Sequence, residues 1–78
     1  MSAILEARGL SCQDVFLLVI HAIKKANEGE IVILVNKVNA REGISRGILN
    51  QGWRIKSIES HGSSLTITIS NEWHFNFL

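Results

Sequence analysis

The chain has 78 residues, of which 46% are hydrophobic and 19% charged, and its formal net charge is +1. This length allows one domain, and this balance is typical of globular rather than disordered proteins. The longest apolar run, Val15 to Ile20, is far shorter than the roughly 20 residues that span a membrane. Met1 to Ile4 contains no secretory signal pattern, and the single cysteine, Cys12, cannot form an internal disulfide. We therefore expect a cytoplasmic protein that does not enter membranes.

Two elements are predicted before residue 30. Ala3 to Ala7 is short and apolar-rich and ends at Arg8-Gly9, which is typical of a strand. A helix is then indicated by apolar residues at the spacing of one helix face, namely Val15, Leu18, Val19, Ala22, Ile23 and Ala26. Lys24 and Lys25 lie in its last turn, where the helix dipole favours cations, and Asn27-Glu28-Gly29 closes it.

A third and a fourth element are predicted between residues 30 and 52. Ile31 to Val35 is apolar on both faces, which is typical of an interior strand with at least partial cover on each face. Asn39 can cap a second helix that continues to about Asn50. Its inward-facing residues are predicted to be Ala40, Ile44, Ile48 and Leu49. Gly43 and Gly47 should weaken this helix by about 1 kcal/mol each relative to alanine.

The last two predicted strands form an antiparallel hairpin. Ser64 to Ser70 alternates apolar and polar residues, as a half-buried strand does. The strand before it contains Ile55 and Ile58, between which the alternation slips. His61-Gly62-Ser63 is the predicted turn between the two strands, and Trp53 is predicted to lie in the core.

The predicted order of elements is β-α-β-α-β-β, which belongs to the α+β class. In so short a chain this order implies a two-layer sandwich, with both helices on one face of a four-stranded mixed sheet. Residues 1–78 form a single domain in this interpretation. Residues 1–2 and the aromatic-rich tail 72–78 are predicted to be peripheral.

Cys12 is the candidate reactive residue, because it stands immediately before the first predicted helix. A thiol there faces free backbone N–H groups and the positive end of the helix dipole, which favour the thiolate. Asp14, in the first turn, opposes this effect by repelling a thiolate. From the residues alone, Cys12 is as readily a small buried hydrophobe as a reactive group. His21 lies about 13 Å along the helix, which is too far for a Cys–His nucleophile pair.

The run Leu5-Glu6-Ala7-Arg8-Gly9-Leu10-Ser11-Cys12, followed by an apolar helix, Gly29-Glu30 and an apolar strand, resembles the TusA/SirA family of sulfur carriers. Members of that family begin with a strand, an acidic-x-x-Gly-Leu-x-Cys-Pro-x-Pro motif and a helix, and they fold as a βαβαββ sandwich. The resemblance covers residues 4–70. Both motif prolines are absent here, where Gln13 and Val15 stand, and Lys37-Val38 replaces the Asp-Pro that often opens the family's second helix.

The resemblance implies that Cys12 accepts a sulfane sulfur from a cysteine desulfurase or a rhodanese, holds it as a persulfide and passes it to an acceptor protein. Such a chain is a sulfurtransferase-like carrier. We expect no cofactor, and no metal either, because His21, His61 and His74 do not have the spacing of metal ligands. The alternative is a catalytically degenerate TusA-like module that binds or regulates a protein partner through a basic surface. RNA is the less favoured partner, because only an analogy of fold suggests it.

Several surface residues are candidates for docking a partner. The segment from Lys37 to Lys56 contains five Lys or Arg residues and one acid, Glu42, and is either an ordinary solvated surface or a patch for an acidic partner. Phe16 and Ile20 continue the line of Cys12 along the helix. They belong either to a broad core face, which we favour, or to a hydrophobic dock beside the thiol. The candidate docking residues are Gln13, Asp14, Phe16, Lys37, Arg41 and Arg46. We expect a monomer or a weak dimer.

Overall fold

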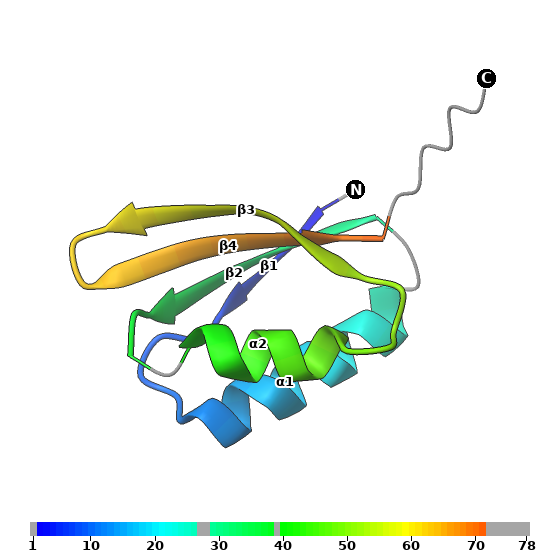
Figure 1. Ribbon diagram of the computed structural model, residues 1–78, viewed down its shortest axis with the longest axis horizontal. Coiled ribbons are helices and arrows are strands. Elements are labelled where there is room, and N and C mark those ends of the chain that lie inside the picture. Colours follow the sequence, from blue (N-terminus) through cyan, green and yellow to red (C-terminus); the bar gives the residue numbers. More distant parts are fainter. Residues whose placement is uncertain (1, 27–28, 39, 72–78) are drawn as a thin grey trace.

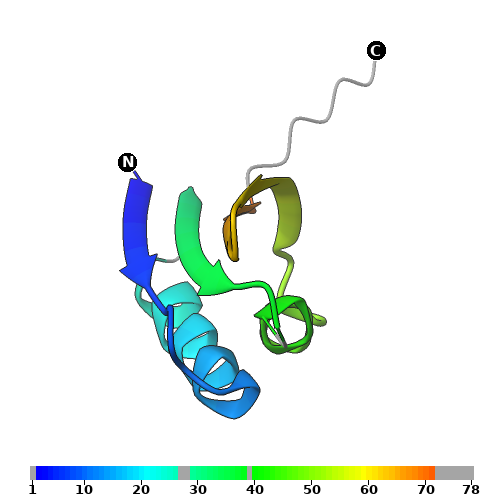
Figure 2. The ribbon, with the colours of Figure 1, turned by 90° about the vertical axis from the view of Figure 1, so that its left-hand side faces the viewer.

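The structure is a computed structural model that describes residues 2–26, 29–38 and 40–71. Its elements are β1 (Ser2–Glu6), α1 (Cys12–Ala26), β2 (Glu30–Asn36), α2 (Ala40–Ile48), β3 (Arg54–His61) and β4 (Ser64–Ser70). The strands form one sheet in the order β1-β2-β4-β3, in which β1 and β2 are parallel and the other neighbours antiparallel. Both helices lie on the same face of this sheet (Figure 1 and Figure 2). The predicted α+β class and two-layer arrangement are confirmed.

Residues 1–2 were predicted to be peripheral, and the structure differs from this prediction at Ser2. Ser2 already belongs to β1, so pairing with β2 begins there. The tail 72–78, which was predicted to be peripheral, lies outside the described residues. Within the described part of the chain, no helix has both the length and the apolar character that a membrane span requires.

The core fills the space between the sheet and the two helices. Ile33 of β2, Ile67 of β4, Val19 of α1 and Ile44 of α2 are all fully buried, so every layer contributes to it. Burying one such side chain stabilises the fold by roughly 1.5–3 kcal/mol. Trp53 is also buried, as predicted. The core consists of Ala7, Val15, Val19, Ile23, Ile31, Ile33, Val35, Ile44, Trp53, Leu65, Ile67 and Ile69.

β2 is an interior strand, as its sequence predicted, but its two faces differ. Ile31, Ile33 and Val35 are fully buried, whereas the intervening Val32 and Leu34 are half-buried. Alternate residues of a strand point to opposite faces, and Figure 2 shows α1 and α2 on one face only. The expected cover is therefore complete on the face toward the helices and only partial on the other.

The slip in the alternation of β3 corresponds to a β-bulge. The pairing of β3 with β4 shifts register between Ile55 and Ser57, which leaves Lys56 as the extra residue. A bulge of this kind inserts one residue into a strand, so Ile58 returns to the same face as Ile55. The predicted hairpin is confirmed, and Gly62 occupies its turn with a φ of 61°.

The two glycines of α2 lie where this helix meets α1. A Cβ atom added to Gly43 would stand 2.7 Å from the backbone oxygen of Cys12, and one added to Gly47 would stand 2.8 Å from Cγ1 of Val19. Neither separation leaves room for a side chain, so only glycine permits the helices to approach this closely. The predicted loss of helix propensity is therefore accompanied by closer packing.

The remaining predictions for the second helix have mixed outcomes. Ile44 is buried and Ile48 packs against the core, as expected. Leu49 is 65% exposed, so the prediction that it faces inward was wrong. The physical reason is that α2 ends at Ile48, and a residue in the turn beyond no longer follows the helical period. The predicted cap Asn39 and the side chain of Ala40 lie outside the described residues.

Candidate functional site

Cys12 is the first residue of α1, and the helix cap is the residue before it. The side-chain Oγ of Ser11 accepts a hydrogen bond from the backbone N–H of Asp14 at 3.2 Å, and its carbonyl accepts one from Val15 at 2.9 Å. This is the geometry of an N-cap, so the expectation that Cys12 precedes the helix was wrong by one residue. The thiol still lies at the positive end of the helix dipole.

The loop between β1 and α1 is held by its own contacts. Gly9 has a φ of 88°, and its N–H donates a hydrogen bond to Oδ1 of Asn36 at the end of β2. Arg8 forms an ion pair with Glu6 at 2.7 Å. Hydrogen bonds from the guanidinium and the backbone N–H of Arg8 lower the pKa of Glu6 to about 2. These contacts fix the path of the chain into Cys12.

The Cys12 side chain faces α2. Its Sγ lies 4.0 Å from Oε1 of Glu42, so the thiol can donate a weak hydrogen bond to the carboxylate. The thiol is half-buried, and Glu42 is exposed. Gly43, the neighbour of Glu42, is the residue that closely approaches the Cys12 backbone. The two helices therefore meet at Cys12, and this contact brings the carboxylate to the sulfur.

Two opposing electrostatic effects act on this sulfur. The free N–H groups at the start of α1 favour a negative charge on it. Glu42 acts in the opposite sense, because its carboxylate repels a negative charge on the sulfur. Two unit charges 4 Å apart repel each other by about 1 kcal/mol in water, and by more where the surroundings are less polar. Arg46 lies one helical turn beyond Glu42 and offsets part of this negative charge.

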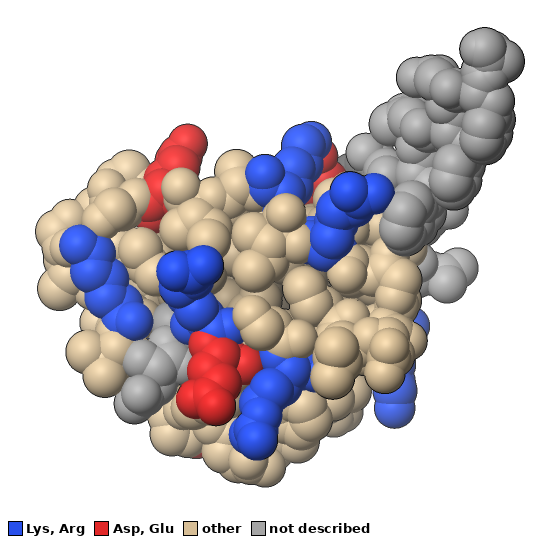
Figure 3. Space-filling model, viewed as in Figure 1, with Lys and Arg blue, Asp and Glu red and all other residues tan. Residues whose placement is uncertain are grey.

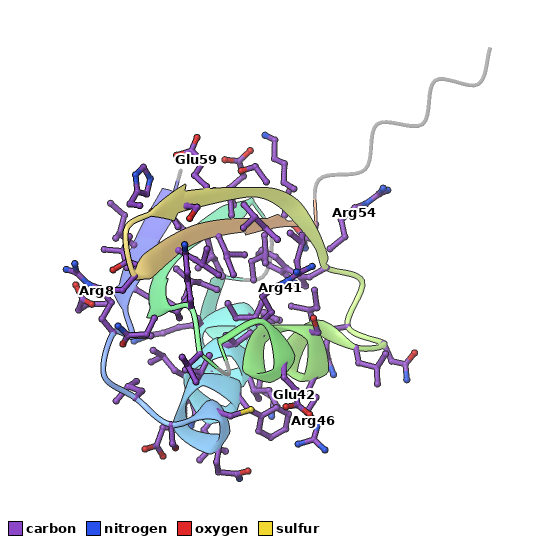
Figure 4. All side chains as sticks on the ribbon, turned by 60° about the vertical axis from the view of Figure 1, so that its left-hand side comes forward. Arg8, Arg41, Glu42, Arg46, Arg54 and Glu59 are labelled. Atoms are coloured by element: carbon purple, nitrogen blue, oxygen red, sulfur yellow. The ribbon has the colours of Figure 1, made fainter. Side chains whose placement is uncertain are left out.

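The predicted docking residues of α2 point in two directions. Figure 4 shows Arg46 together with Glu42 on the side of α2 away from the sheet, and Arg41 on the side toward the sheet. Arg46 therefore shares the Cys12 side of the molecule, whereas Arg41 lies toward β3 and Arg54. The structure does not join these arginines into one surface around the thiol.

The other predicted polar docking residues surround the start of α1 without facing the thiol. Gln13 and Asp14 are exposed in its first turn, one and two positions after Cys12. Side chains at these spacings do not face one another on a helix. Lys37 is exposed in the turn after β2, where its backbone N–H donates to the carbonyl of Ser63 at 3.0 Å.

Phe16 and Ile20 follow Cys12 on α1 at successive turns, and all three are half-buried. Among the described residues, the core and the half-buried side chains packed against it do not include Phe16 or Ile20. The favoured interpretation, a broad core face, is therefore not supported by their positions. Together they form an apolar stripe, which we define as Cys12, Phe16 and Ile20, that begins at the thiol.

The basic segment predicted from the sequence is a surface of mixed charge. Figure 3 shows Lys and Arg side chains over the face that carries α2 and β3, with acidic side chains among them. Lys56 forms an ion pair with Glu30, and His61 lies 3.5 Å from Glu59. Mixed, exposed pairs of this kind are typical of an ordinary solvated surface.

Within the described ranges, no group of three or more His, Cys, Asp or Glu side chains could hold a metal ion. The side chains brought together at the start of α1 are a thiol and a carboxylate. No family model matches the sequence, and no curated protein matches it significantly. The resemblance to the TusA/SirA carriers thus rests on the motif around Cys12 and on the order of the elements.

Glu42 is the residue of the site that the sequence did not reveal. It stood out there only as the one acid in a basic segment, 30 positions from Cys12. The overlooked signal was the spacing of Gly43 and Gly47, because small residues one turn apart permit two helices to approach closely. A close crossing at Gly43 places its neighbour Glu42 beside the opposite helix.

Proposed function

We propose that this chain is a sulfur carrier of the TusA/SirA type, which holds a persulfide on Cys12. The observation that supports this most directly is the position of a half-exposed thiol at the first residue of a capped helix, within the motif Gly9-Leu10-Ser11-Cys12. The backbone N–H groups at that end of α1 favour a bound anion, and a persulfide is one. A reducing cytoplasm is the compartment in which such a thiol stays free.

The proposed transfer is an exchange at sulfur. The Cys12 thiol first gives its proton to solvent or to a neighbouring base. Its thiolate attacks the terminal sulfur of a persulfide on the donor protein; a new S–S bond forms at Sγ as the donor's S–S bond breaks. The donor cysteine leaves as a thiolate and takes up a proton. One donor persulfide and one Cys12 thiol thus become one donor thiol and one Cys12 persulfide, with no external oxidant.

The donor and acceptor would approach along the apolar stripe. Cys12 stands at the end of this stripe, so a partner that covers Phe16 and Ile20 reaches the sulfur without unfolding the start of α1. Burial of the two side chains excludes water from the sulfur during transfer. Replacing Phe16 by Ser should slow transfer from a donor protein while leaving reaction with a small alkylating reagent unchanged.

The direct test is the mass of the intact protein after incubation with a cysteine desulfurase and cysteine. We expect a gain of one sulfur atom that a reducing thiol removes again. Cys12→Ser should show no gain. If neither a desulfurase with cysteine nor a rhodanese with thiosulfate adds sulfur to the wild-type chain, the carrier proposal is wrong.

A degenerate binding module is the second candidate, and two features favour it. Both motif prolines, which preorganise the first turn of a helix, are absent. In addition, the Glu42 carboxylate lies 4.0 Å from the sulfur, where it repels a bound anion. In that case Cys12→Ser should leave partner binding unchanged, whereas a carrier loses its function with the same substitution.

A further inference from the structure

We propose that Glu42 determines the charge of the sulfur donor that Cys12 accepts, by admitting positively charged or neutral donors ahead of anionic ones. This inference rests on the proposed carrier function and specifies the partner. A suitable donor presents Lys or Arg beside its persulfide, so that its cation pairs with Glu42 as the two sulfurs meet. An acceptor would be selected in the same way.

The proposal rests on a contact between two helices. Sγ of Cys12 belongs to α1, and the carboxylate 4.0 Å away belongs to α2. The contact follows from the helix crossing, since Gly43 lies against the Cys12 backbone at a separation that no side chain permits. The packing of the fold therefore places Glu42 at the helix crossing, beside the start of α1.

Other charges also act near the thiol, and the free N–H groups at the start of α1, which favour anions, oppose the effect of Glu42 in part. Asp14 is also acidic, although it stands two positions from Cys12 and points elsewhere. Arg46 lies one turn further along α2 and, like Glu42, is exposed to solvent, so it offsets part of the effect of the carboxylate. A reagent that reaches Cys12 therefore comes close to a carboxylate that lies 4.0 Å from the sulfur. Attraction to the carboxylate should speed the reaction of a cationic reagent with the sulfur, and repulsion should slow that of an anionic one.

Paired methanethiosulfonate reagents of opposite charge test the proposal on the whole chain. One carries a trimethylammonium group and the other a sulfonate group. In both reactions the Cys12 thiolate attacks the sulfenyl sulfur, a mixed disulfide forms and methanesulfinate leaves. The measured quantity is the ratio of the two rate constants. The fraction of thiolate cancels in this ratio, so a variant that merely alters ionisation of the thiol does not change it.

We expect Glu42→Gln to lower the ratio of cationic to anionic rates by about fivefold, which is the order expected for one charge near 4 Å in water. Glu59→Gln is the matched control, because it removes an exposed carboxylate from β3. That variant should keep the wild-type ratio. Raising the ionic strength should shrink the difference between wild type and Glu42→Gln.

The proposal is overturned if Glu42→Gln, folded as judged by an unchanged urea midpoint, keeps the wild-type ratio. It is also overturned if neither reagent labels Cys12. The measurement needs no donor protein. It can therefore contradict the proposal about Glu42 without contradicting the carrier function. A chain that takes sulfur from a desulfurase but shows no effect of Glu42 remains a carrier without this selectivity. If the ratio depends on Glu42 but the chain takes up no sulfur, the charge selectivity is supported and the carrier function is contradicted.

Discussion

α1 and α2 pack side by side on the same face of the sheet, yet different interactions stabilise them. α1 has 15 residues, a serine cap and two lysines in its last turn, all of which act locally. α2 has nine residues and carries glycine at two buried positions. Isolated helices shorter than about 12 residues are marginal in water, and glycine weakens them further. Local sequence therefore supports α1 in addition to the packing of its buried residues, whereas α2 depends on packing against α1 and the core.

The largest loss of stability is expected from replacing the residue through which α2 packs in the core. Ile44 is fully buried, so Ile44→Ala removes apolar contacts and leaves a cavity. We expect a loss of about 2–5 kcal/mol in the free energy of unfolding, measured by urea denaturation. Leu49→Ala, at an exposed position just beyond α2, is the control and should change stability by about 0.5 kcal/mol or less. Equal effects of the two substitutions would contradict the account of α2.

Gly43→Ala separates helix propensity from packing, because the two predict opposite signs. Propensity alone predicts a gain of about 1 kcal/mol from alanine. The new Cβ, however, would meet the backbone oxygen of Cys12 at 2.7 Å, and overpacking of this kind typically costs about 1–3 kcal/mol. We expect net destabilisation in urea. Ser45→Ala, at an exposed position of the same helix, should be neutral or stabilising. A stabilised Gly43→Ala variant would show that the helices do not meet closely.

A smaller effect is expected at the cap of α1. Ser11→Ala removes the side-chain acceptor for the Asp14 N–H and should lower the stability by about 1 kcal/mol. Ser11→Asp retains an acceptor at this position and should lose much less. Amide hydrogen exchange at Asp14 would report the loss locally, and wild-type protection in Ser11→Ala would argue that the cap does not stabilise α1.

The smallest effect should arise in the loop that leads into α1. Arg8 lowers the pKa of Glu6 from 4.5 to about 2. Because the folded pKa is the lower one, the stabilising contribution is present above pH 4.5 and is lost as the pH falls toward 2. Both side chains are exposed, so the effect on stability is slight. An NMR titration of the Glu6 carboxyl should show the low pKa, and Arg8→Gln should return it to the ordinary range.

The same contrast between local and tertiary effects explains what the sequence could predict. The helical period of α1, the apolar run of β2 and the alternation of β4 each act within one element, and all three elements were predicted. The slip between Ile55 and Ile58 was visible as well, and it corresponds to the bulge. Each of these patterns repeats within a few residues, so it can be read along the chain.

The features that were not predicted depend on contacts between elements or, at the start of α1, on which side chain caps the helix. The approach of Glu42 to Cys12 joins residues 30 positions apart and depends on how two helices cross. The half-exposed state of Phe16 and Ile20 depends on which face of α1 packs against the rest of the fold. The helix start was misplaced by one residue because the Ser11 hydroxyl caps α1. Such details require the three-dimensional arrangement.

The strand order has a practical consequence for handling this protein. The backbones of Ser2 and Ser70 both pair with Glu30 of β2, so they lie at one end of the sheet, about 10 Å apart at the usual strand spacing. Cys12 follows the opposite end of β1. A short linker between Ser2 and Ser70 would therefore suit circular permutation. Molecules anchored to a sensor chip through this end would all present Cys12 to the solution.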